Sequence, residues 1–210
     1  RSEVRAEAAA ALRRFPEEQV LRALERLRGA PSLDRSREGR VLLIGLRGAG
    51  KSSLGREVAR RMDLPFLEMS KEVERAYGGE MRLLIEIGGQ AALRRYEHEA
   101  WEAIRASHDT AIIATPGGVV ADPELFDRML ATAHSVWIEA TPEDHMSRVV
   151  AQGDFRPMSS GRGAMNDLRA ILAARSEEYA RAGQRLDTSA QGFEATVDCL
   201  EVIVRKLVRS

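Results

Sequence analysis

Residues 40–52 read RVLLIGLRGAGKS, and this stretch decides the fold. Its first half, 40–44, is a short apolar run typical of a buried parallel strand. Its second half, Gly45 to Ser52, matches the phosphate-binding pattern G-x-x-x-x-G-K-[ST] and leads into a helical pattern. The order of strand, loop and helix predicts a polyphosphate ligand, and the alternative is a glycine-rich turn without a ligand.

Each residue type in this loop has a physical role in holding an anion. Gly45, Gly48 and Gly50 allow backbone conformations that turn consecutive N–H groups inward as an anion-binding nest. Lys51 adds a mobile positive charge, and Ser52 is a candidate Mg²⁺ ligand at the positive end of the helix dipole. The expected phosphate-binding residues are Gly45, Arg47, Gly48, Ala49, Gly50, Lys51, Ser52 and Ser53.

The length and composition of the chain exclude several classes of protein. The chain has 210 residues, 44% of them hydrophobic, which suits one α/β domain plus an appendage. Its 32 basic and 32 acidic residues balance, so it lacks the positive field of an autonomous nucleic-acid-binding domain. The single cysteine excludes an internal disulfide framework. With no membrane-spanning stretch or signal peptide in the sequence, we expect a cytoplasmic protein with no membrane partner.

Two regions of different character follow each other along the chain. Residues 1–39 contain helical patterns at 2–14 and 17–27 and then a polar stretch, so we expect a helical linker. The apolar stripe at 17–27 fits packing on the main domain or pairing with a second subunit. Residues 40–210 alternate strand and helix patterns, which predicts an α/β, doubly wound, five-stranded parallel sheet. The expected strands are residues 40–44, 65–69, 110–114, 135–139 and 184–187.

Polar groups follow the predicted strands at the sheet edge where α/β proteins bind ligands. Gly117 and Gly118 permit close approach of the backbone to a ligand, although an ordinary loop explains them equally well. Arginines can hold phosphate or carboxylate there through bidentate contacts. Glu97 and His98 are expected to orient Arg94 or to face solvent. The expected pocket residues are Glu68, Ser70, Arg94, Gly117, Gly118, Arg156 and Arg175.

Over residues 40–208 the sequence resembles shikimate kinase. The resemblance implies a P-loop kinase fold, with Arg156 on a lid and residues 186–188 near the nucleotide base. It is carried by the loop Gly45 to Ser52 and by residues 66–68, 72–74, 93–97, 117–118, 156–158, 175–179 and 186–188.

Two departures from that family's pattern fall in the acceptor half of the site. Such kinases carry D-x-D after the second strand, whereas this chain has Glu68, Met69 and Ser70. Pro116 replaces the first residue of a triple-glycine run. A serine does not serve as the carboxylate that aligns an attacking hydroxyl, and losing such a group costs about 10²–10⁴ in rate. The departures predict a degenerate kinase fold with no catalytic residues and no required cofactor.

A complete phosphate loop beside a changed acceptor half is also found in another group of proteins. The sequence is similar to the effector domain of the benzoyl-CoA-responsive transcriptional regulators of bacterial benzoate degradation, especially at residues 46–52 and 148–158. This resemblance implies benzoyl-CoA as the effector, DNA binding through a helix-turn-helix domain upstream of this chain, and a homodimer. The alternative hypothesis is an ATP-dependent small-molecule kinase of the shikimate kinase type, with Mg²⁺ at Ser52 and Glu68. A third hypothesis is a nucleotide-binding scaffold.

Overall fold

The computed structural model describes residue 37, residues 39–151 and residues 162–208. The described part contains one five-stranded sheet with all strands parallel, in the order β2-β3-β1-β4-β5. The strands are β1 (Gly39–Ile44), β2 (Phe66–Glu68), β3 (Thr110–Ala114), β4 (His134–Glu139) and β5 (Gln184–Asp187). The predicted sheet is confirmed, whereas the predicted linker helices and Arg156 lie outside the described residues.

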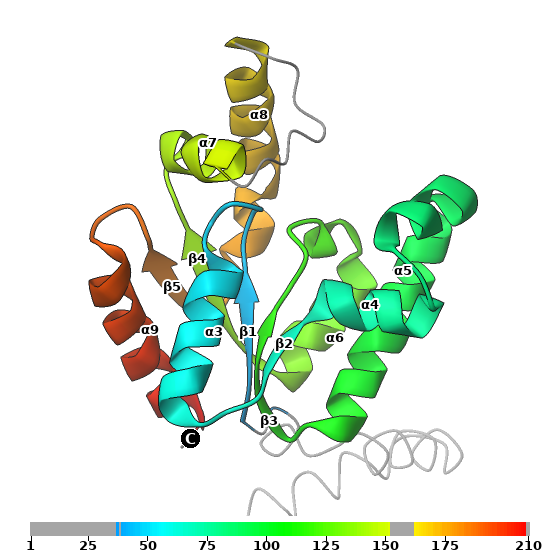
Figure 1. Ribbon diagram of the computed structural model, residues 1–210, viewed down its shortest axis with the longest axis horizontal. Helices are drawn as coiled ribbons and strands as arrows, with labels where there is room; N and C mark the ends of the chain where they lie inside the picture. The colour runs from blue at the N-terminus through cyan, green and yellow to red at the C-terminus, as the bar shows by residue number, and fades with distance from the viewer. Residues whose placement is uncertain (1–36, 38, 152–161, 209–210) are drawn as a thin grey trace, which may run out of the picture. The chain divides into compact units, whose positions relative to one another are not determined.

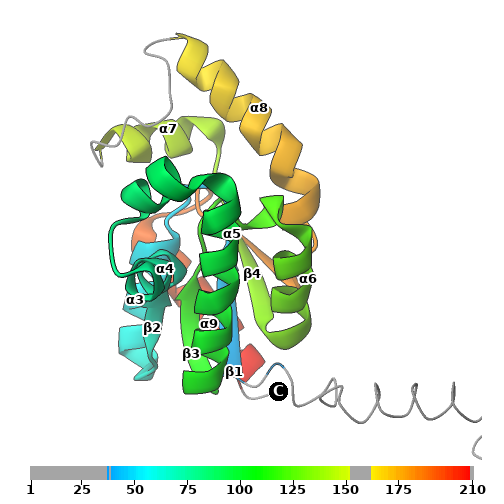
Figure 2. The same ribbon diagram turned by 90° about the vertical axis from the view of Figure 1, so that its right-hand side faces the viewer.

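Helices cover both faces of the sheet (Figures 1 and 2). The helix α3 packs with α9 on one face, and α5, α6 and α8 pack on the other. The helical elements are α3 (Lys51–Met62), α4 (Met69–Tyr77), α5 (Met81–Ser107), the short 3-10 helix η1 (Val119–Ala121), α6 (Pro123–Thr132), α7 (Pro142–Ala151), α8 (Arg162–Tyr179) and α9 (Phe193–Val208).

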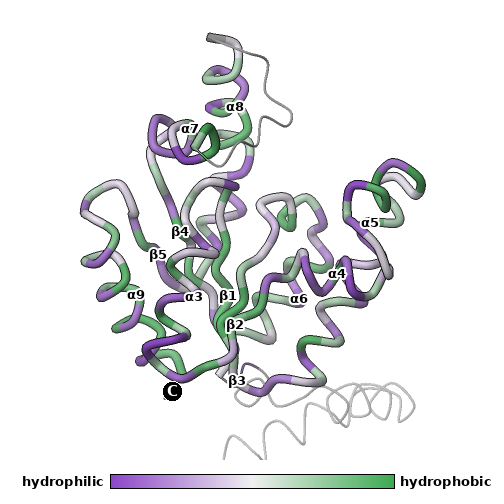
Figure 3. Tube along the Cα trace, in the orientation of Figure 1, coloured by the Kyte–Doolittle hydropathy of each residue, from purple (hydrophilic) through white to green (hydrophobic). Residues whose placement is uncertain are grey.

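The central strand β1 is buried on both faces and apolar along most of its length (Figure 3). Val41 and Leu43 face the layer of α3 and α9, whereas Leu42 and Ile44 face the layer of α5, α6 and α8. All four side chains have 0% exposure, as expected of a strand between two helical layers. The core therefore fixes the carboxyl end of β1, from which the phosphate loop emerges.

The strand β2 is one residue shorter at each end than the strand expected at 65–69. The strand β2 ends at Glu68 and α4 begins at Met69, so Ser70 lies in the first helical turn. The long helix α5 is interrupted at Gly89, whose φ of 65° and ψ of −168° are not helical. The helices α4 and α5 share a small core of their own, formed by Val73, Leu84, Leu93 and Ala100.

Side chains cap the starts of two helices. Asp122 accepts a hydrogen bond from the Leu125 amide at 3.1 Å, with Pro123 in the first turn of α6. Thr141 accepts one from the Asp144 amide at 3.2 Å at the start of α7. Among the described residues, no helix is both long enough and apolar enough to cross a membrane.

Candidate active site

The phosphate loop follows β1 and has the backbone conformation that the sequence predicts. Gly45, Gly48 and Gly50 have φ values of 137°, 82° and 99°, which favour glycine. The constraint is tightest at Gly45, where a Cβ would lie 2.3 Å from the carbonyl oxygen of Ile138 on β4. The loop therefore depends on glycine both for its conformation and for its packing against β4.

Lys51 folds back over the loop. Its Nζ donates to the carbonyl oxygens of Gly45 at 2.7 Å and Leu46 at 3.0 Å. Because the side chain is buried, the pKa of the Lys51 ammonium is lowered to about 8. The positive charge thus lies inside the cradle. A bound polyphosphate would raise the pKa of Lys51 again and favour the protonated amine.

Two side chains of α7 bind the outer side of the loop. The Nδ1 of His145 donates to the Arg47 carbonyl at 3.0 Å, and the Nη1 of Arg148 donates to the Ala49 carbonyl at 3.2 Å. Burial lowers the pKa of the His145 imidazole, so the neutral ring is favoured. The sequence prediction missed both residues, and the available signal was weak, namely two polar side chains one helical turn apart.

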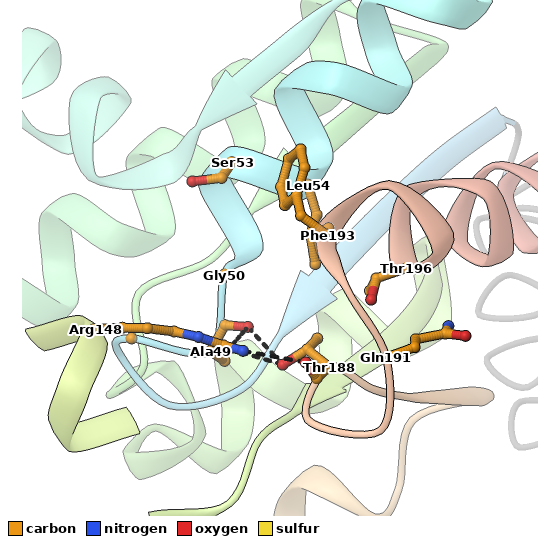
Figure 4. Close-up of a pocket in the computed structure, with 10 residues that line it drawn as sticks. Ala49, Gly50, Ser53, Leu54, Arg148, Thr188, Gln191, Phe193 and Thr196 are labelled. Carbon is orange, nitrogen blue, oxygen red and sulfur yellow. Dashed lines mark hydrogen bonds between the residues drawn. The ribbon is translucent and has the colours of Figure 1, made fainter. Parts of the chain in front are cut away.

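One cavity lies beside the loop where β5 leads into α9 (Figure 4). Its volume is about 280 Å³, close to the lower end of the range for ligand pockets. The Arg148 guanidinium forms one wall and donates to Thr188 Oγ1 at 2.8 Å and to the Thr188 carbonyl at 3.1 Å. The ring of Phe193 is half exposed and gives an apolar surface opposite. The lining residues are Gly48, Ala49, Gly50, Ser53, Leu54, Arg148, Thr188, Gln191, Phe193 and Thr196.

A second cavity lies on the other side of the loop, between it and the segment that follows β3. Its volume is about 290 Å³. Gly48, Gly50 and Ser53 line both cavities, so the loop forms the boundary between them. The lining residues are Arg47, Gly48, Gly50, Lys51, Ser52, Ser53, Thr115, Pro116 and Gly117.

The Gly117 wall of the second cavity is fixed by α8. Arg175 Nη1 donates to the Gly117 carbonyl at 3.0 Å, and the Tyr179 hydroxyl donates to the same oxygen at 2.6 Å. A Cβ on Gly117 would approach the Arg47 amide nitrogen to 3.0 Å, whereas one on Gly118 would meet nothing within 4 Å. Of the two predicted glycines, Gly117 lines the cavity, and close packing requires glycine only there.

The remaining predicted pocket residues form pairs near this region. Arg94 donates to the buried carboxylate of Glu97, whose pKa is raised by burial, so the expectation that Glu97 orients Arg94 is confirmed. His98 contacts Asp122 at 3.1 Å. Glu68 accepts a 3.5 Å hydrogen bond from Arg56. Glu68, Ser70, Arg94, Gly118 and Arg175 line neither of the two cavities.

The groups beside the loop fit a nucleotide-bound magnesium ion. Ser52 is exposed at the start of α3 and lines the second cavity, next to the phosphate cradle. Mg²⁺ commonly takes one or two protein oxygens and completes its shell with phosphates and water. Among the described residues, no cluster of three His, Cys, Asp or Glu side chains could hold a metal by itself.

Comparison with known proteins identifies the family. Residues 47–207 match the family model described as shikimate kinase. The chain belongs to the shikimate kinase family. A shikimate kinase from Symbiobacterium thermophilum is 34% identical over 80% of this chain and 95% of the relative. One from Thermus thermophilus is 31% identical over 80% of this chain and 90% of the relative.

Solved structures of the family have the same fold. The shikimate kinase from Acinetobacter baumannii in complex with shikimate superposes with a TM-score of 0.69 at 23% identity, covering 84% of this chain and 98% of that chain. The shikimate kinase from Bacteroides thetaiotaomicron gives a TM-score of 0.70 at 23% identity, covering 79% and 98%. At this identity the likeness supports the fold alone.

These comparisons correct the functional hypothesis drawn from the sequence. The expectation of a degenerate regulatory domain, with benzoyl-CoA as effector and DNA as partner through an upstream domain, is wrong, whereas the homodimer stays a prediction. The curated relatives that match most of this chain are named as kinases. The error came from weighing one changed carboxylate position, Ser70, above a complete phosphate loop with a cavity on each side.

Proposed function

We propose that the protein is an ATP-dependent kinase that phosphorylates a hydroxyl group of shikimate. The observation that carries this proposal is the position of the phosphate loop between two cavities. Gly48, Gly50 and Ser53 line both of them, so a terminal phosphate on the loop would face the second cavity. A nucleotide on one side and a small acceptor on the other is the arrangement that phosphoryl transfer requires.

The loop and α3 supply the electrostatic part of the reaction. Inward-turned N–H groups and the helix dipole hold the phosphates, and Lys51 lies against the loop carbonyls beside them. Mg²⁺, bound through the nucleotide and the Ser52 hydroxyl, would neutralise charge on the phosphoryl oxygens. Because this transition state is loose, positioning and charge stabilisation provide most of the catalysis.

The acceptor residues expected from the sequence lie outside the lining of the second cavity, and their chemistry suits a ligand that carries a carboxylate and hydroxyls. Arg94 is held by Glu97, and Arg175 holds the cavity wall at Gly117. Guanidinium groups favour carboxylates through paired hydrogen bonds. Ser70 replaces a carboxylate of the family pattern, which changes one aligning contact, and Glu68 at the end of β2 keeps a carboxylate in this region. Shikimate, the substrate in the names of the relatives, has the matching groups.

A coupled assay of ADP release tests the proposal. With ATP, Mg²⁺ and shikimate, we expect a turnover of about 1–100 s⁻¹, the usual range for kinases. The phosphorylated product should be identified by mass spectrometry, because ATP hydrolysis alone would also release ADP. Product formation no faster than in a matched preparation of Lys51→Ala would contradict the proposal.

A further inference from the structure

We propose that His145 is a positioning residue that holds the phosphate loop in its anion-binding conformation. It lies on α7, whose own sequence carries no phosphate-binding pattern. The proposal rests on the proposed function only in requiring that the loop binds a polyphosphate.

The argument begins with the geometry of the peptide unit. In a trans peptide, the C=O of one residue and the N–H of the next point in opposite directions. A donor that holds the carbonyl of residue 47 on the outer side of the loop therefore directs the amide of residue 48 toward the inner side. The same relation connects the carbonyl of Ala49 with the amide of Gly50.

Donors from α7 hold two carbonyls of the loop in this way, and Lys51 binds two others from inside the cradle. His145 binds the carbonyl of Arg47 at 3.0 Å, and Arg148 binds that of Ala49 at 3.2 Å. Lys51 binds the two preceding carbonyls, those of Gly45 and Leu46. The amides of Gly48 and Gly50, which the positive φ values of the glycines help to turn inward, are thus the ones that α7 orients.

The contact between α7 and the loop is close as well as polar. A Cβ on Gly48 would lie 3.0 Å from the backbone oxygen of His145 and 2.9 Å from a methyl group of Val149. His145 itself is 1% exposed. With its neutral ring donating from Nδ1, the side chain leaves the loop little room to reverse the peptide between Arg47 and Gly48.

This arrangement predicts a preorganisation effect. Without the His145 donor, the peptide after Arg47 is free to rotate, and only a fraction of molecules has the Gly48 amide directed inward. The apparent affinity for phosphate falls in proportion to that fraction. A role in stability alone would lower the unfolding temperature without a specific loss of phosphate affinity.

The test measures binding of tripolyphosphate by calorimetry, with Mg²⁺ present, because this probe has neither a base nor an acceptor. We compare the wild type with His145→Asn, whose amide nitrogen replaces Nδ1, and His145→Leu, which keeps the volume but removes the donor. We expect about tenfold weaker binding in His145→Leu and rescue to within about threefold in His145→Asn. Ser135→Ala removes a buried hydrogen bond to the Gly183 amide, at the other end of β4, and serves as the stability control.

Equal affinity of the wild type and His145→Leu would overturn the proposal, as would an asparagine variant as weak as the leucine variant. If His145→Leu does not fold, His145→Phe removes the same donor while keeping an aromatic ring, and unchanged tripolyphosphate affinity in that variant would overturn the proposal. Wild-type protein that fails to bind tripolyphosphate at millimolar concentration would refute this inference together with the proposed function. Binding that follows the expected pattern in a protein that does not phosphorylate shikimate would refute the proposed function alone.

Discussion

The two halves of the site are built on different principles. The phosphate half is made of backbone from one continuous segment, Gly45 to Ser52, braced by donors from α7. The proposed acceptor half is made of side chains from separate elements, among them Arg94, which pairs with Glu97 within α5, and Arg175 of α8, which binds the Gly117 carbonyl. Of the described residues of that half, Pro116 and Gly117 line the second cavity directly.

This difference explains why the ligand of the phosphate half could be predicted from the sequence, whereas the residues of the acceptor half led to a wrong functional prediction. A backbone cradle needs particular glycines, so its sequence pattern corresponds closely to its chemistry. The acceptor side chains come from elements distant in sequence, and one changed member, such as Ser70, alters a contact without removing the site. We therefore expect substitutions in the phosphate half to cause large losses of activity or stability, and substitutions in the acceptor half to cause small ones.

The largest effect is expected for Lys51→Ala. Removing the buried ammonium takes away a charged donor at the transferring phosphoryl group, so we expect kcat/KM to fall by about 10²–10³ in the coupled assay. Nucleotide affinity should weaken by about 1.5–3 kcal/mol. Lys71→Ala is the matched control, because Lys71 is exposed and its ammonium pairs with Glu74 at 2.8 Å. Unchanged affinity in Lys51→Ala would place the ligand elsewhere.

The next largest effect is on stability, at Gly45. An alanine there combines an unfavourable φ with a Cβ placed 2.3 Å from the Ile138 carbonyl oxygen. We expect the free energy of unfolding, measured by urea denaturation, to decrease by about 2–4 kcal/mol. Gly118→Ala is the control from the acceptor half, where φ is −92° and the space is open, and it should be neutral or slightly stabilising. Similar losses of unfolding free energy in Gly45→Ala and Gly118→Ala would contradict the expected difference between the two halves of the site.

The pH dependence of nucleotide binding tests the buried charge. The pKa of Lys51 is lowered by burial to about 8, and a bound polyanion favours the protonated form and raises that pKa. Affinity should therefore be level below about pH 7 and fall through pH 8, by about tenfold between pH 7 and pH 9 as the cationic fraction declines. Calorimetric titration with ADP measures this. In Lys51→Ala the decline should vanish, and a wild-type curve that stays level to pH 9 would refute the assignment.

A smaller effect is expected for Arg175→Leu in the acceptor half. The Gly117 carbonyl would lose its guanidinium donor but keep the Tyr179 hydroxyl. We expect the KM for shikimate to rise about fivefold, in line with the loss of one hydrogen bond to a charged group, while the KM for ATP is unchanged. Arg169→Leu, an exposed position on the same helix paired with Glu143, should change neither constant. An equal rise in both constants would mean that α8 supports the whole site.

The sequence allowed the sheet and the loop to be predicted because their signals are local. The strands β3 and β5 and the helix α9 begin and end at the predicted residues. The contribution of α7 was missed, because the hydrogen bond from His145 to Arg47 joins residues 98 positions apart. The geometry of the interruption of α5 at Gly89 also could not be predicted, because helical periodicity does not give the direction of a bend.

Thr188 has a consequence for how the protein is made. Its hydroxyl lies 3.3 Å from the Ala49 carbonyl, across 139 positions of sequence, and accepts a hydrogen bond from Arg148. Contacts of such long range form late, after the cost of ordering the intervening chain. On the ribosome, the nucleotide cradle therefore stays incomplete until translation has passed the last strand. A nascent chain therefore gains the stabilising effect of a bound nucleotide only after β5 has been made, so earlier folding must rely on the core alone.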